Sequence, residues 1–194
     1  MRNQSKDFDL NFHTARLLLE EPFFAAISRR VNKRASFGIS TAGVIVNRET
    51  AQFEMLYNPD FMDSMTDPER RAILIHEFYH IIFKHVTDRL PEGGMTKAWN
   101  IAADLAINSH IANLPKGGCI PGEGSEGEQG QRGKSASEGD SDLDTLDDHS
   151  GWGDVPQEIK DIANERLKDI VQQATDEASQ SGSWGSVSSE TRKE

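Results

Sequence analysis

Residues 70–90 read RRAILIHEFYHIIFKHVTDRL. A helix formed by this stretch would carry apolar side chains nearly all round, which is typical of a buried helix. Thr66 and Glu69 have the spacing of a capping box and Pro68 suits a first turn, so we expect the helix to start there. We expect it to continue to Leu90, because a proline follows.

The motif HEFYH lies inside this predicted helix, with His76 and His80 four residues apart. On a helix such residues lie about 40° apart around the axis and one turn along it, so both imidazoles can reach one Zn²⁺ ion. Glu77 lies about 100° from His76. It could accept a proton from a zinc-activated water and pass it to a leaving amine.

The alternative interpretation is that His76, Glu77 and His80 are core residues that make ordinary hydrogen bonds and bind no metal. Polar side chains in a buried helix are costly without partners. One metal ion would satisfy the three together, whereas separate hydrogen bonds would require three coincidences. We therefore predict a metal site.

A catalytic zinc needs a third protein ligand and an open position. His85 lies five residues after His80, about 140° round a straight helix, and would point away from the metal. A capping or buried-network role suits it better. His110 lies near the end of the next predicted helix. Both stay open as alternative ligands.

Asp104 is the preferred third ligand, 24 residues beyond His80 on a helix that can fold back antiparallel. Asn100, Asp104 and Asn108 recur every four residues and form a polar stripe on an otherwise apolar helix. Such a stripe could also face solvent. We expect the two asparagines to orient metal ligands, a role that such sites usually need.

The rest of the pattern predicts an α+β fold, mainly helical, with a small β-sheet or hairpin beside the HExxH helix. Residues 36–47 and 51–58 are predicted strands joined by a turn. Further helices are expected at 10–21, from Pro22, at 96–114 and at 155–178.

Composition divides the chain further. We expect a core at 1–114 and a disordered Gly-rich, acidic insertion or linker at 115–146. A helical segment at 147–180 should pack on the core, and 181–194 should be a flexible tail.

The net charge of −11 argues against a nucleic-acid partner, which would need a basic stripe. The sequence has no apolar run long enough for a membrane helix and no recognisable signal peptide. Its single cysteine excludes an internal disulfide. We expect a soluble protein in a reducing compartment, the cytoplasm.

The stretches HEFYHIIFKH and WNIAADLAIN, with STAGVIV and FEMLYNP before them, resemble the putative metallopeptidase domain family of bacteria and phages. This resemblance implies a zincin-like fold and metal-dependent peptidase activity. It implies His76 and His80 as ligands, Glu77 as base and Asp104 as a further ligand. Longer relatives carry a von Willebrand A-like domain, so a partner protein could stand in its place here.

By analogy with zincin-like folds, the strand FEMLYNP would pair with an extended peptide. Tyr57 at its end could contact substrate or stabilise an oxyanion, although a core tyrosine is the simpler interpretation. His149 in DDHSGW could donate to the transition state, or lie on the surface. Trp152 and Trp184 could anchor partners, although simple packing is the simpler interpretation.

The sequence thus favours a zinc metallopeptidase that acts on a protein or peptide substrate. Two rivals remain. One is a non-catalytic module that keeps zinc for structure, associated with a phage or mobile element; a fourth ligand at His85 or His110 would favour it. The other is a latent peptidase, switched on by a partner or by movement of the 115–146 segment.

Overall fold

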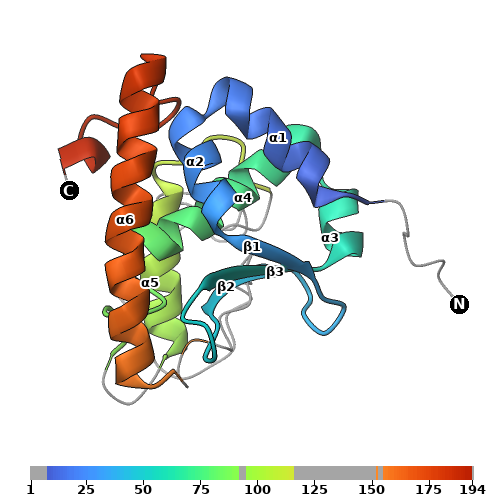
Figure 1. Cartoon of the computed structure of the whole chain (residues 1–194). Helices are drawn as coiled ribbons and strands as arrows, with labels where there is room; N and C mark the ends of the chain where they lie inside the picture. The colour runs from blue at the N-terminus through green and yellow to red at the C-terminus, as the bar shows by residue number, and fades with distance from the viewer. Residues whose placement is uncertain (1–7, 92–94, 116–151, 153–154, 194) are drawn as a thin grey trace, which may run out of the picture.

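The computed structural model describes residues 8–91, 95–115, 152 and 155–193. The predicted α+β class is confirmed, with helices packed around one three-stranded sheet (Figure 1). The helices are α1 (Leu10–Glu20), α2 (Pro22–Arg30), α3 (Pro59–Ser64), α4 (Asp67–Ile82), α5 (Lys97–Asn108) and α6 (Gln157–Ser181). The strands are β1 (Asn32–Ala35), β2 (Ala42–Val46) and β3 (Phe53–Tyr57), and a short 3-10 helix spans Thr191–Lys193.

The HExxH helix α4 begins as predicted. A carboxylate oxygen of Glu69 accepts from the Thr66 backbone N–H at 2.8 Å and from its hydroxyl at 2.6 Å, which satisfies donors at the helix start. Residues Ala72 to Ile81 of α4 are buried. The helix therefore runs through the centre of the protein with its polar motif enclosed.

The predicted continuation of this helix to Leu90 is wrong, because α4 ends at Ile82. Lys84 adopts a left-handed conformation with φ 58°, and its N–H donates to the Ile81 carbonyl at 3.0 Å. The His85 N–H donates to the His80 carbonyl at 2.9 Å. These two bonds form a Schellman motif with lysine at the position that glycine usually occupies. The chain turns back here, so a straight-helix projection of His85 fails.

The sheet has the strand order β1-β3-β2, with β1 parallel and β2 antiparallel to β3. The predicted hairpin is confirmed: the antiparallel register pairs Val44 with Met55. Strand β3 lies between two partners, so its backbone bonds are already used in the sheet. The expectation that FEMLYNP pairs with an extended peptide is therefore wrong, and β2 instead forms an edge.

Strand β1 was not predicted, because its sequence NKRA is polar and largely exposed. It is held by parallel pairing to β3, from Asn32 opposite Glu54 to Ala35 opposite Tyr57. Long-range pairing of this kind leaves no local pattern in the sequence.

Helix α6 runs along α2 and also contacts α4 (Figure 1). Of its large apolar residues Leu167 is buried at 3% exposure, whereas Ile162 is 47% exposed. Its inward face carries mainly small residues, which allow the helices to approach closely. The buried apolar residues of α6 are Ala163, Leu167, Ala174 and Ala178.

The end of the chain packs on the core within residues 183–193, where the sequence had led us to expect a flexible tail. The Trp184 ring stacks on Phe23 with 5.8 Å between centroids, and Val187 is 2% exposed. Packing of these two apolar side chains explains the difference, since burial offsets the entropy of ordering the segment.

None of the helices that the structure describes has both the length and the apolar character needed to cross a membrane. Most of the predicted linker at 115–146 lies outside the described residues, as does His149.

Candidate metal centre

His76 and His80 project from the same side of α4, one turn apart, and their Nε2 atoms lie 2.9 Å from each other. Both side chains are buried, at 2% and 0% exposure. Their four-residue spacing on a regular helix produces this convergence, as the sequence predicted.

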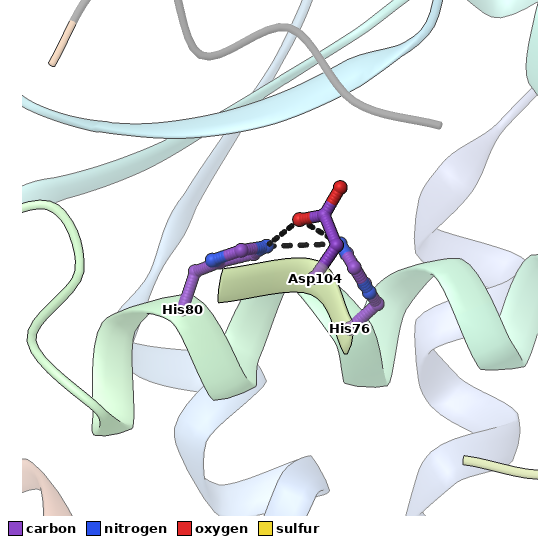
Figure 2. A group of neighbouring side chains, drawn as sticks. All are labelled: His76, His80 and Asp104. Atoms are coloured by element: carbon purple, nitrogen blue, oxygen red, sulfur yellow. Dashed lines mark hydrogen bonds and ion pairs between the residues drawn. The ribbon is translucent and has the colours of Figure 1, made fainter. Parts of the chain in front are cut away.

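Asp104 reaches the same point from α5, the helix that packs against α4. Its Oδ1 atom lies 3.4 Å from the Nε2 of His80 and 3.8 Å from the Nε2 of His76. Figure 2 shows the carboxylate directed at both rings, with the two imidazoles below it on α4. Among the described residues these three side chains could hold a metal ion, with their ligand atoms all within 4.8 Å of one another.

The positions of the three ligand atoms fit a metal ion with tetrahedral coordination. Ligand atoms about 2.0–2.1 Å from such an ion lie about 3.3 Å from each other, and the three observed separations fall around that value. Asp104 is 2% exposed and its Oδ1 has no hydrogen-bond partner among the described residues. A buried carboxylate oxygen without a donor is costly, and a cation at this point would remove that cost.

Asn108 holds the His76 ring from the far side. Its Oδ1 lies 2.8 Å from the Nδ1 of His76 and accepts that N–H, which leaves the Nε2 lone pair directed toward Asp104. Asn108 lies one turn after Asp104 on α5, so one helix supplies both a ligand and the group that orients another. The predicted orienting role of Asn108 is thus supported by geometry.

His85 contacts His80 in an equivalent way, with 2.9 Å between their Nδ1 atoms. His85 is 4% exposed and its ring also packs against Trp99. It lies behind His80, outside the group of three ligands, and so takes the buried-network role. His110, the other alternative, packs its ring 6.0 Å from Tyr79 and is likewise outside that group.

Residues 5–193 match a protein family described as a putative metallopeptidase domain. The chain belongs to this family. An uncharacterised protein of Thermotoga maritima is 34% identical over 65 residues, which make up 34% of this chain and 16% of that protein. The chain thus spans a small part of that relative's length. No solved structure matches the chain significantly.

In this family member the proposed base, Glu77, is fully buried at 0% exposure and follows ligand His76 on α4. Helical geometry places its side chain about 100° round the axis from His76. Glu77 is thus a buried carboxylate next in the chain to a candidate metal ligand.

Two other residues predicted for the site, Tyr57 and His149, are not placed at the three candidate ligands by the described structure. The Tyr57 ring packs edge-on to Phe8, 6.2 Å between centroids, near the start of α1. Burial, with a smaller effect from Asp9, raises the pKa of the Tyr57 hydroxyl, so this group is neutral at physiological pH. His149 is not among the described residues, and its role stays a prediction.

Trp152 lies beside the centre, which sequence reasoning did not anticipate. Its ring packs edge-on to His80 with 5.0 Å between centroids and approaches Trp99 at 5.9 Å. Its indole N–H donates to the Val44 carbonyl of β2 at 2.6 Å. A tryptophan between glycines gave no local signal for contacts with α4 and β2.

Proposed function

We propose that this protein is a zinc-dependent peptidase of zincin-like architecture. The observation that carries the proposal is the convergence of His76, His80 and Asp104 in a buried cluster on the helix that also bears Glu77. Membership of a family described as a putative metallopeptidase domain supports the same activity.

Zinc is the proposed ion because two imidazoles and one carboxylate form a ligand set common in catalytic zinc sites. Zn²⁺ bound there would lower the pKa of a water molecule and polarise the carbonyl of a peptide bond. Other divalent ions accept the same ligands, so the metal itself is part of the test.

The protein's own groups would have distinct tasks. Glu77 would accept a proton from the attacking water and later donate it to the leaving amine. Asn108 would fix the His76 ring by accepting its Nδ1–H, and His85 would contact the Nδ1 of His80. These contacts would hold both imidazoles in place, so that their Nε2 atoms could bind an ion.

The proposed substrate is a protein or peptide bound in an extended form. Because β3 is enclosed by β1 and β2, a peptide would pair with an edge strand of the described sheet, and β2 is the edge strand that packs against α4. Strand β2 packs against α4, so a peptide on this edge would lie near the metal ligands.

A non-catalytic zinc module would surround its ion with four protein ligands. The described part of the chain offers three, and neither His85 nor His110 belongs to the group. This count favours a centre with one position open to water or substrate, and therefore the peptidase.

Metal content and cleavage of fluorescently labelled casein, measured on wild type, Glu77→Gln and Asp104→Ala, would test the proposal. We expect Glu77→Gln to retain one zinc per chain and to lose cleavage. Asp104→Ala should lose both. Full zinc occupancy in Asp104→Ala would exclude it as a ligand, and undiminished cleavage in Glu77→Gln would refute the mechanism.

A further inference from the structure

The edge of β2 can be read from its bonds to β3. The Asn58 N–H donates to the Thr41 carbonyl and the Asn47 N–H to the Gln52 carbonyl. In an antiparallel pair every second residue bonds to the partner strand. Residues 41, 43, 45 and 47 therefore face β3, and the backbone groups of Ala42, Val44 and Val46 face outward.

Val44 is the central residue of this outward row, and its carbonyl is the acceptor of the Trp152 indole N–H at 2.6 Å. A peptide that added to the edge of β2 would use the same carbonyl. Trp152 and an added strand therefore compete for one acceptor.

The indole ring also fills the space toward the metal ligands. It lies against His80 and Trp99 and is 1% exposed. A single side chain thus joins this edge of the described sheet to His80, a candidate ligand. His76, His80, Glu77 and Asp104 are each 2% exposed or less. These side chains are therefore screened from solvent, and Trp152 is one of the residues that cover His80.

We propose that Trp152 is an internal occupant of the substrate position, which keeps the centre closed until the indole is displaced. The inference rests on the proposed peptidase function and adds its regulation. An aromatic ring between β2 and His80 further indicates that the displaced position takes an aromatic side chain of the substrate.

Trp152→Ala, Trp152→Phe and a control, Trp184→Ala, would test this. Trp184 is a suitable control because it is also a tryptophan but packs on Phe23 rather than on His80. The first measurement is the rate at which zinc-loaded protein releases zinc to an excess of the chelator 4-(2-pyridylazo)resorcinol. The second is cleavage of peptides that differ only in one aromatic or alanine residue.

We expect Trp152→Ala to release zinc about tenfold faster than wild type and to cleave faster, with a preference for the aromatic peptide. Trp152→Phe keeps a ring but loses the N–H, so about fivefold faster release is expected from loss of one hydrogen bond. Trp184→Ala should match wild type in both rates. Melting temperatures identify the variants that are folded.

Wild-type release and cleavage rates in a folded Trp152→Phe or Trp152→Ala would overturn the proposal. An equal acceleration in Trp184→Ala would also overturn it, because general loosening would then be the cause. Faster zinc release in the Trp152 variants without cleavage by any variant would support the covering role and reject the peptidase. The two proposals therefore fail separately.

Discussion

The side chains of His80 and His85 meet through their Nδ1 atoms at 2.9 Å, and their backbones are joined by a second bond of 2.9 Å from the His85 N–H to the His80 carbonyl. The turn that ends α4 therefore places His85 in contact with a candidate metal ligand. Because Lys84 takes a left-handed conformation, a residue five positions after His80 returns to contact it.

His85→Ala should weaken zinc affinity by about 10- to 100-fold, because the His80 ring loses the group that orients it. Competition with a chromogenic chelator measures the change. His85→Asn keeps an acceptor and should recover part of the affinity. The control is His110→Ala; an equal loss there would show that the effect is not specific to the contact with His80.

Asn108→Leu should lower zinc affinity by about tenfold, because the Nδ1–H of His76 then lacks its acceptor. Asn108→Asp retains an oxygen at the same place and serves as the matched control. Isothermal titration of the metal-free proteins with zinc distinguishes the two. Equal affinities in the Leu and Asp variants would contradict the assigned role.

Lys84→Gly should raise the free energy of unfolding by about 1 kcal/mol, since glycine adopts positive φ without the clash that a side chain meets. The exposed contact of Lys84 with Asp88 contributes little to stability. Urea denaturation measures the gain. Lys84→Ala retains the backbone strain, so a similar gain in that variant would disprove the explanation.

Burial lowers the pKa of Lys33 from 10.5 to about 8, and its ammonium donates to the Ser28 and Val31 carbonyls. Between pH 8 and 10.5 the unfolded chain thus binds the proton more tightly than the folded one. Stability should rise with pH across this window and be lower below pH 8.

The control for this titration is Lys33→Met, which has no ionisable group at the position. The difference in unfolding free energy between wild type and Lys33→Met should change by about 1–3 kcal/mol from pH 8 to 10.5, after allowance for solvent screening. A difference that is constant with pH would refute the shift. Urea denaturation at several pH values provides the data.

The three residues that could hold a metal ion were predictable because each helix repeats its polar residues at four-residue intervals. The four-residue interval brings His76 beside His80, and the stripe on α5 brings Asp104 and Asn108 to the same face. Only the packing of α5 against α4 had to be assumed. The Gly-rich turn expected after Leu90 made that assumption reasonable, although the observed connection is longer because α4 ends at Ile82 and α5 begins at Lys97.

Other features depend on contacts that leave no local period. Strand β1 is polar and exists through pairing with β3, and Lys84 turns the chain without the glycine that would have signalled it. Trp152 bonds to a residue 108 positions earlier. Features of this kind depend on contacts between residues far apart in the sequence or on a strained backbone. Local sequence patterns do not reveal either of these.

Because α4 supplies two of the converging side chains and α5 the third, a bound divalent ion would staple two helices together, much as a disulfide links distant parts of a chain. Stripping that ion would leave a carboxylate enclosed opposite two imidazoles and would loosen the anchorage of α5. The occupancy of the metal site could then be measured by how strongly α5 resists proteolysis, before any substrate is known.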